Sequence, residues 1–334
     1  MKAMVLDGIA PIESSPLKLT ELPAPEPAAR QVRVKVSCCG ICRTDLHVIE
    51  GELPPQKLPV IPGHQIVGVV DALGAECSVL AEGMRVGLAW LRHTCGLCPF
   101  CKSGRENLCE SQRFTGYHED GGFAEYALVD ERFAYEIPDQ FSGVEAAPLL
   151  CAGIVGYRAL KRSNLPRGGR LAIYGFGSSA HVIIQIALHR GCDVYVVTRG
   201  AEHRQLAAEM GAVWVGTSAE EMPVKADSAI IFAPAGPLVP QALKALEKGG
   251  TLSLAGIYMT PVPEMDYQQC LFYERDVHSV TANTRADGRE LLAEAAEIPI
   301  RPHTTTYKLA DANRALQDLK ADKISGTGVL VVGG

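Results

Sequence analysis

Four cysteines that lie close together in the sequence have the spacing of a metal site. Cys95, Cys98, Cys101 and Cys109 form the pattern C-x2-C-x2-C-x7-C. Four thiolates complete the tetrahedral shell that zinc prefers, and short gaps let one loop supply them all. A common iron–sulfur motif instead has a three-residue final gap followed by proline, whereas Glu110 follows here. The pattern predicts a structural zinc with no open position for substrate; an iron–sulfur cluster and unligated thiols are the alternatives.

A glycine-rich segment has the pattern of a dinucleotide-binding turn. Gly175, Gly177, Ser178, Ser179 and Ala180 fit G-x-G-x-x-G/A. The segment follows an apolar run at 171–174 and opens a predicted helix over 179–190, which is the context that this turn requires. The glycines permit a tight turn and a close approach of the backbone to a pyrophosphate at the helix N-terminus. The sequence therefore predicts dinucleotide binding, with alanine in place of the third glycine.

Two further segments contain cysteine and histidine, but their spacing alone does not pair them. A C-R-T-D-x-H motif occupies 42–47, His64 stands in a Gly-His-Gln segment, and Cys151 comes much later. A lone buried cysteine or histidine is usually a core residue. Together with the four-cysteine loop and the glycine-rich turn, in this order, these segments resemble the zinc-dependent alcohol dehydrogenases of the medium-chain dehydrogenase/reductase superfamily. The resemblance covers essentially the whole chain.

The resemblance implies a second, catalytic zinc with an open fourth position for water or alcohol. Its ligands would be Cys42, His64 and Cys151. Asp45 would hydrogen-bond the outer nitrogen of His64, while Thr44 and His47 would pass the hydroxyl proton of the alcohol toward solvent. Turn capping is the alternative role for Thr44 and Asp45. Because zinc lowers the pKa of a bound hydroxyl and polarises a carbonyl, the implied reaction is hydride transfer between an alcohol and a nicotinamide dinucleotide.

One position departs from the family pattern. The family usually has glutamate after the histidine ligand, and this chain has Gln65. Glutamine keeps the shape but removes one negative charge near the metal, which predicts a more electrophilic zinc and slower ligand exchange. The alternative is that Gln65 only hydrogen-bonds its neighbours.

Cofactor choice depends on the end of the second strand of the nucleotide-binding unit, where NAD enzymes place an acidic residue. Thr198 occupies that position, and Arg199, His203 and Arg204 follow. Without a carboxylate to repel a phosphate, the sequence favours NADP(H) over NAD(H) by a modest margin. Solvated surface arginines and NAD(H) are the alternative. The resemblance also places Ala255, Ile257 and Arg285 at the cofactor, the first two at the nicotinamide amide and Arg285 near the pyrophosphate.

The substrate pocket is expected next to the catalytic metal. By position in the family, Leu53 and Trp90 would line it, and Thr44 would narrow it. Both Trp90 and Thr44 favour small or unbranched primary alcohols and aldehydes. A methylene or branch changes discrimination by only about 1–3 kcal/mol, so several substrates should be accepted. Plain core packing is the alternative for Trp90.

The elements that must position these residues change in type near Cys151. Before it, short β-rich runs at 32–36, 66–70 and 123–129 predict a mainly antiparallel β region, with 66–70 buried on both faces. After it, strands alternate with helices of ten or so residues, which predicts a parallel sheet of βαβ units. The expected strands are 171–174, 193–197, 229–232, 251–255 and 327–332. The expected helices are 179–190, 202–210, 238–247 and 310–320.

The predicted fold class is α/β. It joins a doubly wound Rossmann domain over 153–282 with a mainly antiparallel, GroES-like catalytic domain formed by 1–152 and 283–334. At 334 residues the chain exceeds the usual size of one hydrophobic core, so two domains are expected.

Composition sets the remaining expectations. The net charge is -6 and no basic run stands out, so nothing indicates nucleic acid or an anionic membrane as a partner. The first apolar run is too short for a signal peptide, and no run of about 18 apolar residues occurs. A cytoplasmic location is expected, where eleven cysteines indicate metal binding rather than disulfides. Family resemblance suggests a homodimer or homotetramer.

Two rival functions remain open from sequence. The chain could be an aldehyde- or polyol-specific reductase, or a catalytically silent protein that binds zinc and dinucleotide on the same fold. Intact Cys42, Thr44, His47, His64 and Cys151 argue against the silent alternative, and Gln65 is the feature that keeps it open.

Overall fold

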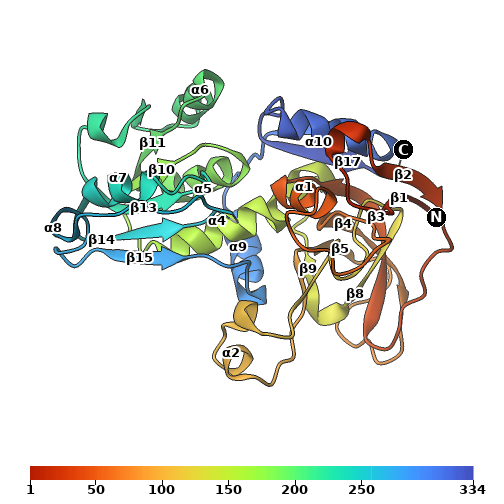
Figure 1. Ribbon diagram of the computed structural model, residues 1–334. Coiled ribbons are helices and arrows are strands. Elements are labelled where there is room, and N and C mark those ends of the chain that lie inside the picture. The colour runs from red at the N-terminus through yellow and green to blue at the C-terminus, as the bar shows by residue number, and fades with distance from the viewer. Residues whose placement is uncertain (257, 334) are drawn as a thin grey trace. The chain divides into compact units, whose positions relative to one another are not determined.

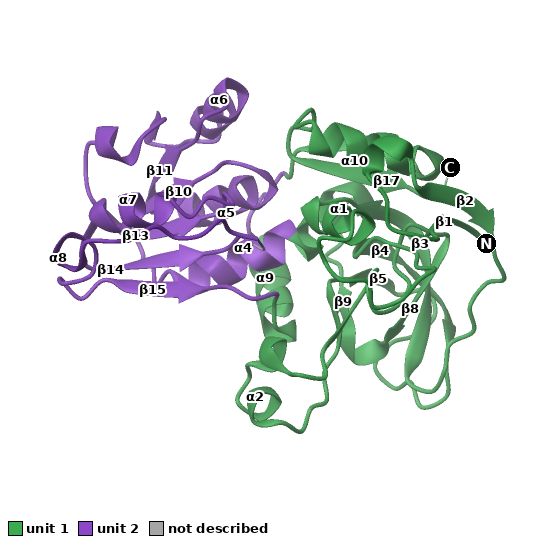
Figure 2. Cartoon of the chain, viewed as in Figure 1, with its two compact units in different colours: residues 1–151, 283–296, 302–334 green, residues 152–282, 297–301 purple. Residues whose placement is uncertain are grey.

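The computed structural model describes residues 1–256 and 258–333 and divides into two compact units (Figures 1 and 2). Unit 1 comprises Met1–Cys151, Asn283–Ala296 and Pro302–Gly334. Unit 2 comprises Ala152–Ala282 and Glu297–Arg301. The chain thus leaves unit 1 after Cys151 and returns to it at Asn283.

Unit 2 is built on a six-stranded parallel sheet. In spatial order its strands are β12 (Trp214–Gly216), β11 (Asp193–Val197), β10 (Arg170–Tyr174), β13 (Ala226–Ile231), β14 (Leu246–Leu254) and β15 (Asp276–Ser279). The chain order therefore reverses between β10 and β13, which is the topological switch point of the doubly wound fold. Its helices are α4 (Ala152–Arg162), α5 (Ser178–His189), α6 (Ala201–Glu209), α7 (Leu238–Lys244), α8 (Tyr267–Cys270) and the 3-10 turn η5 (Ala219–Glu221).

The central strands of unit 2 are buried on both faces. In β10, Leu171 and Ile173 point to one side and Ala172 and Tyr174 to the other, and none is more than 1% exposed. Helix α7 packs on β10, β13 and β14, while α5 packs on β11 and against α4. Continuous apolar strands covered by helices are what a parallel sheet requires. The predicted Rossmann class is confirmed.

Unit 1 is mainly antiparallel. Its seven-stranded sheet runs β16 (Thr304–Lys308), β17 (Thr327–Val331), β3 (Gln31–Gly40), β4 (Gln65–Leu73), β5 (Arg85–Leu88) and β9 (Ala134–Glu136), with β8 (Tyr126–Asp130) also pairing with β3. Two-stranded sheets join β1 (Lys2–Leu6) to β2 (Leu17–Glu21) and β6 (Leu91–His93) to β7 (Arg113–Phe114). Only β16 and β17 pair in parallel among these strands.

Short helices connect and cover the strands of unit 1. The α-helices are α1 (Arg43–Ile49), α2 (Pro99–Lys102), α3 (Gly143–Ala146), α9 (Arg285–Glu297) and α10 (Ala312–Lys320). The 3-10 turns are η1 (Ile12–Ser14), η2 (Glu106–Leu108), η3 (Glu131–Phe133), η4 (Ala147–Leu150) and η6 (Leu309–Asp311). One core cluster joins β1, β3, β4 and β5 to α10 through buried side chains such as Val34, Ile66 and Leu316.

Several predicted elements differ from the observed ones. The predicted helix 238–247 ends at Lys244, because Leu246 is fully buried and already pairs with Ala226 of β13. The prediction that 66–70 is buried on both faces is wrong at Val69, which is 40% exposed. The strand expected from Phe123 begins only at Tyr126, because the backbone of Phe123 bonds instead to Met4 and Pro62.

No single helix among the described residues is long and apolar enough to cross a membrane; taken together, the bent pair Gly143–Leu150 and Ala152–Arg162 passes that test by length and composition only. All eleven cysteines are free thiols. The cysteines are therefore available to bind metal.

Candidate functional site

Cys42, His64 and Cys151 meet in unit 1 although they are far apart in sequence. The Cys42 Sγ lies 3.4 Å from His64 Nε2, which lies 3.4 Å from the Cys151 Sγ, and the two sulfurs are 3.9 Å apart. With Zn–S bonds of about 2.3 Å and Zn–N bonds of about 2.0–2.1 Å, a tetrahedron has S···N edges of about 3.6 Å and S···S edges of about 3.8 Å. The three atoms therefore have the spacing of three zinc ligands, which leaves the fourth vertex open.

The elements of unit 1 explain how this triangle forms. Strands β3 and β4 pair antiparallel, with Gly40 opposite Gln65. Cys42 comes two residues after Gly40, and His64 comes directly before Gln65, so the two lie near each other at this end of the strand pair. Cys151 follows η4, which packs on β3, β4 and β5. The register of β3 and β4 and the packing of η4 on the sheet thus bring the three candidate ligands together.

Asp45 connects the start of α1 to the triangle. One carboxylate oxygen, Oδ2, accepts a hydrogen bond from the Cys42 backbone N–H at 2.8 Å, which caps the helix. The other, Oδ1, lies 3.1 Å from His64 Nδ1. Asp45 is 2% exposed and His64 1%. From sequence, capping of the helix and orientation of the imidazole are alternative roles for Asp45. The position of this one side chain allows both.

The charges of the triangle suit a divalent cation. A hydrogen bond from the Cys151 thiol holds the pKa of Cys42 well below its ordinary value, against the effect of burial. Burial disfavours a charged His64, but Asp45 and the Cys42 thiolate outweigh it and raise the pKa of His64 to about 10. Because a metal ligand must be deprotonated, a divalent cation at this triangle would bind more tightly as pH rises.

Thr44 and His47 lie on α1 beside the triangle. The backbone N–H of Thr44 points at the Cys42 sulfur at 3.4 Å, and its side chain is buried. His47 is partly exposed, and its Nδ1 contacts the carboxylate of Glu52. The backbone N–H of Leu53 donates to the carbonyl of His47 at 3.1 Å, which fixes the segment after α1. A buried hydroxyl near the metal ligands and a histidine near solvent are the arrangement that a proton relay needs.

Trp90 contacts His64 of the triangle. Its indole meets the imidazole of His64 edge-on, with ring centroids 4.9 Å apart and an interplanar angle of 72°. Phe114 and Tyr117 stack on the same indole, at 4.7 Å and 5.8 Å. Trp90 is only half-buried, so part of its surface stays uncovered. Sequence reasoning missed Phe114 and Tyr117, which nothing in their local sequence connects to position 90.

The four cysteines 95, 98, 101 and 109 also converge. Their sulfurs all lie within 4.8 Å of one another. The backbone N–H groups of Leu97 and Cys98 donate to the Cys95 sulfur and lower the pKa of this thiol to about 6. Burial acts in the opposite direction on Cys101 and raises its pKa to about 12. Four sulfurs and amide donors to one thiolate fit a closed zinc site.

Arg285, which the sequence assigns to the cofactor, binds Glu106 in unit 1. Its Nη2 donates to Oε2 at 2.6 Å, and its Nε and backbone N–H donate to Oε1 at 3.0 and 2.8 Å. The guanidinium also lies over the ring of Phe133 at 4.5 Å. Glu106 stands in η2, between the third and fourth cysteines of the loop, so this ion pair ties the cysteine loop to α9. A pyrophosphate would have to compete with this carboxylate for Arg285.

Burial works to raise the pKa of Glu106, but the hydrogen bonds and charge of Arg285 outweigh it and lower that pKa. Sequence reasoning missed Glu106, because 179 positions separate it from Arg285. Only its place inside the cysteine motif is a local signal.

The glycine-rich turn connects β10 to α5 in unit 2. Gly175 has φ +86, a conformation that favours glycine. A Cβ at Gly177 would meet nothing within 4 Å, so the chain leaves open space there, and no side chain caps the N-terminus of α5. Ser178 and Ser179 form the first turn, and Ala180 is fully buried. The open space at Gly177 and the N-terminus of a 12-residue helix form a cradle that fits a pyrophosphate.

The other predicted cofactor residues follow neighbouring parallel strands. Thr198 is buried after β11, and Arg199 is exposed. Arg204 donates to the carbonyls of Thr198 and Arg199, so its guanidinium is partly engaged. Ala255 follows β14, and its N–H bonds to the end of β13. Position 257, predicted with Ala255, lies outside the described residues. The carboxyl ends of parallel strands share one edge, so the turn, Thr198 and Ala255 are gathered there.

The amide of Gln65 is buried without a partner. The residue is 0% exposed, and neither amide atom has a hydrogen-bond partner. A Cβ at Gly40 would lie 2.8 Å from its Oε1, so glycine is needed there. The alternative that Gln65 hydrogen-bonds its neighbours through this amide is not what the described residues show.

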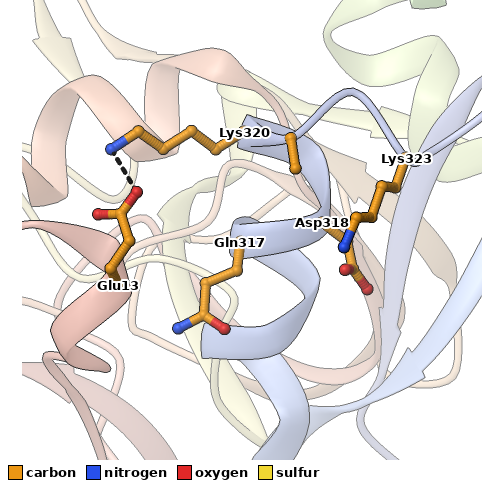
Figure 3. A pocket seen from close by; sticks show the side chains of 6 residues that line it. Glu13, Gln317, Asp318, Lys320 and Lys323 are labelled. Carbon is orange, nitrogen blue, oxygen red and sulfur yellow. Dashed lines mark ion pairs between the residues drawn. The ribbon is translucent and has the colours of Figure 1, made fainter.

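An open pocket in unit 1 lies elsewhere on the chain. Figure 3 shows its lining residues Glu13, Gln317, Asp318, Lys320, Ala321 and Lys323. Lys320 bridges Glu13 at 2.9 Å and Glu50 at 2.7 Å. None of the six is a predicted site residue, and the lysine is engaged by the acidic side chains around it.

Comparison with known protein families gives two matches. Residues 28–139 match the alcohol dehydrogenase GroES-like domain, and residues 180–297 match the zinc-binding dehydrogenase family. The first segment contains the predicted metal-site and pocket residues that precede Cys151: Cys42, Thr44, Asp45, His47, Leu53, His64, Trp90, Cys95, Cys98, Cys101 and Cys109. The second contains much of the predicted nucleotide-binding set: Ala180, Thr198, Arg199, Arg204, Ala255, Ile257 and Arg285.

Relatives extend the likeness over the whole chain. A probable alcohol dehydrogenase AdhA of Mycobacterium tuberculosis (strain CDC 1551 / Oshkosh) is 49% identical, over 99% of this chain and 97% of its own. An alcohol dehydrogenase of Geobacillus stearothermophilus is 36% identical, over 99% and 98%. A crystal structure of a putative zinc-binding dehydrogenase from Sinorhizobium meliloti 1021 bound to NADP superposes with a TM-score of 0.87 at 29% identity, covering 99% of each chain.

Replacing Gln65 tests what its neutral amide does near the triangle. In Gln65→Glu a second buried negative charge beside the ligands should oppose loss of a proton from bound alcohol. We expect the pH profile of kcat/KM to move to higher pH by about one unit, with faster cofactor release. Gln65→Met is the neutral control. An unchanged profile and unchanged release in Gln65→Glu would contradict the prediction.

Replacing Arg285 tests its partnership with Glu106. Arg285→Met leaves a mostly buried carboxylate without its cation and should lower the free energy of unfolding by about 2 kcal/mol, measured in urea. Zinc should leave the cysteine loop faster under chelator, while the KM for dinucleotide stays unchanged. Arg289→Met, an exposed arginine on the same helix, is the control. Equal stability of the two variants, or a raised dinucleotide KM in Arg285→Met alone, would restore the cofactor role.

Proposed function

Because this chain belongs to the zinc-dependent alcohol dehydrogenase family and is an oxidoreductase that acts on alcohols, we propose that Cys42, His64 and Cys151 hold its catalytic zinc. The observation that carries this proposal is the triangle of 3.4, 3.4 and 3.9 Å between their ligand atoms. When bound, zinc supplies a Lewis acid that favours loss of the hydroxyl proton from an alcohol and polarises an aldehyde or ketone.

The side chains around the triangle supply positioning and proton transfer. Asp45 would accept a hydrogen bond from Nδ1 of His64 and so leave Nε2 free to bind the zinc. The Thr44 hydroxyl accepts the proton of the alcohol, and His47, which is partly exposed, carries it to solvent. Burial of Thr44, Asp45 and His64 keeps water away from the charges, which strengthens their interaction with the reacting oxygen.

We propose a second, structural zinc on Cys95, Cys98, Cys101 and Cys109. Its support is the mutual approach of four sulfurs, which form a group without histidine or carboxylate among the described residues. The two proposed zinc ions then have different roles. The ion on the four cysteines would stabilise their loop, and the ion on Cys42, His64 and Cys151 would bind substrate.

We assign the dinucleotide to unit 2 and the zinc chemistry to unit 1. The cradle at Gly177 and the N-terminus of α5 favour a pyrophosphate, and Gly175, Thr198 and Ala255 share its edge of the sheet. NADP(H) is favoured over NAD(H), because Thr198 brings no carboxylate and Arg199 is exposed.

Small, mainly primary alcohols and their aldehydes are the proposed substrates. The indole of Trp90 lies directly against His64 and is backed by the stacked rings of Phe114 and Tyr117, and Thr44 is buried beside Cys42. A catalytically silent role is not favoured, because named alcohol dehydrogenases match nearly the whole chain. A role as an aldehyde- or polyol-specific reductase differs only in substrate and direction, so rates in the reducing direction distinguish it.

A homo-oligomer in the cytoplasm is the proposed physical state. Strand β15 is an edge strand of the unit 2 sheet, and Tyr267, Phe272, Tyr273 and Val277 are exposed on or near it. An unpaired edge next to exposed aromatic side chains is a surface that pairs readily with another copy.

Oxidation of ethanol, 1-butanol and 2-butanol tests the catalytic zinc. We expect the zinc-replete protein to oxidise the two primary alcohols fastest, and Cys42→Ser to lose at least about 1,000-fold in kcat/KM. Cys77→Ser is the matched control, because Cys77 belongs to neither cysteine cluster. Turnover that survives in Cys42→Ser would contradict the assignment.

Arg199 tests the cofactor. Arg199→Asp removes a charge-assisted contact to the 2′-phosphate and adds a repulsive carboxylate. The ratio of kcat/KM for NADP to that for NAD should fall about 10- to 100-fold. Arg167→Asp, at another exposed arginine of unit 2, makes the same change in net charge and should leave the ratio alone. A wild-type ratio in Arg199→Asp would exclude Arg199 from phosphate recognition.

A further inference from the structure

An aromatic cluster lies next to His64, and one of its members, Tyr117, is also fixed at its hydroxyl. The cluster consists of Trp90, Phe114 and Tyr117, and His118 packs against the last two. Among the described residues it is the indole that forms a ring contact with the metal-ligand imidazole. The indole and the Tyr117 ring are 20° from parallel. Tyr117 is 9% exposed, whereas Trp90 is half-buried. The ring that lies near the reacting position is therefore the less constrained one, and the ring behind it is the more constrained.

The hydroxyl of Tyr117 is fixed by the segment that follows α1. It donates a hydrogen bond to the Pro54 carbonyl at 2.6 Å. It also accepts one from the Gln56 side-chain Nε2 at 3.4 Å. The segment is itself attached to α1, because the Leu53 N–H donates to His47. A phenol that both donates and accepts in this way has no freedom to turn away from the indole.

These contacts form a continuous connection in unit 1. It runs from His47 through Leu53 and Pro54 to the Tyr117 hydroxyl, and from the Tyr117 ring through Trp90 to His64. Both ends of the connection are proposed members of the catalytic machinery. Tyr117 joins its two halves, because its hydroxyl makes the hydrogen bond and its ring stacks on the indole. Removing its hydroxyl would break the connection without creating a cavity.

We propose that Tyr117 is a positioning residue that sets the choice between unbranched and branched alcohols by holding the indole of Trp90 against His64. This inference rests on the proposed function of the triangle. A fixed indole excludes the second carbon substituent of a secondary alcohol, while a primary alcohol presents only hydrogen on that side. The indole can discriminate between branched and unbranched alcohols only if it is held in place. If it were mobile, a small shift of the ring would make room for the branch.

Tyr117→Phe tests the proposal by deleting only the hydroxyl. We expect the preference for the branched alcohol, measured as kcat/KM for 2-butanol divided by kcat/KM for 1-butanol, to rise about 3- to 10-fold. The change should come mainly from a lower KM for the branched substrate. Gln56→Ala removes the longer of the two hydrogen bonds and should raise this preference less. Tyr126→Phe is the matched control, because this tyrosine lies on β8 with its ring under Arg33.

A second readout does not depend on turnover. Only two tryptophans are present, so Trp214→Phe leaves Trp90 as the single indole. In that background Tyr117→Phe should increase acrylamide quenching of Trp90 fluorescence and lower its anisotropy, whereas Tyr126→Phe should change neither.

The outcomes separate the two proposals. An unchanged alcohol preference and unchanged Trp90 quenching in Tyr117→Phe, with an active parent, overturn the positioning role alone. A parent that oxidises no alcohol overturns the proposed function, and the fluorescence of Trp90 still tests whether Tyr117 holds the indole. A raised preference for the branched alcohol that Tyr126→Phe reproduces would also contradict the proposal, because the effect would then be a general loss of rigidity.

Discussion

The antiparallel register of β3 and β4 is the constraint on which the candidate site depends. With Gly40 opposite Gln65, His64 comes directly before Gln65 and Cys42 comes two residues after Gly40. A shift of the register by one residue would turn every side chain of the strand to the other face and separate the two ligands. Close packing protects the register, because a Cβ at Gly40 would lie 2.8 Å from the Gln65 amide. The same pairing that builds the sheet therefore places two of the three proposed ligands.

The position of the third proposed ligand, Cys151, depends on the packing of η4 against the sheet and not on strand pairing. Cys151 follows η4, and a Cβ at Gly87 of β5 would lie 2.7 Å from the side chain of Leu150. The turn thus lies directly on the sheet that carries the other two ligands. Asp45 then joins helix and metal site, since one of its oxygens caps α1 and the other meets His64. Asp45 therefore contributes both to the fold, as the cap of α1, and to the proposed metal site, through His64.

Local patterns were enough for some parts of the site and not for others. The loop of four cysteines and the glycine-rich turn are predictable from spacing, because each is formed by a short continuous segment whose residues have to be neighbours. The triangle was found only through family resemblance, because 109 positions separate Cys42 from Cys151. No local signal links Tyr117 to Pro54, and the only local signal for Glu106 is its place inside the cysteine motif, which does not point to Arg285. Pairs of this kind become visible only when the register of the sheet and the packing of its loops are known.

The fold class was predictable for a related reason. Runs such as Leu171 to Tyr174 are apolar at every position, which only a strand buried on both faces explains, and alternation with helices requires a parallel sheet. Element ends were less predictable. Leu246 is apolar and continues the spacing of α7, yet it pairs with Ala226 in the sheet, and tertiary pairing outweighs helix propensity there.

Zinc content is the most direct test of the central claim that two separate cysteine clusters hold two metal ions. We would measure it by mass spectrometry after exhaustive dialysis, in the parent chain, in Cys42→Ser and in Cys98→Ser. The account predicts about two zinc ions per chain in the parent and about one in each variant. Equal zinc content in the parent and in Cys42→Ser would contradict it, because the triangle of Cys42, His64 and Cys151 would then hold no metal of its own.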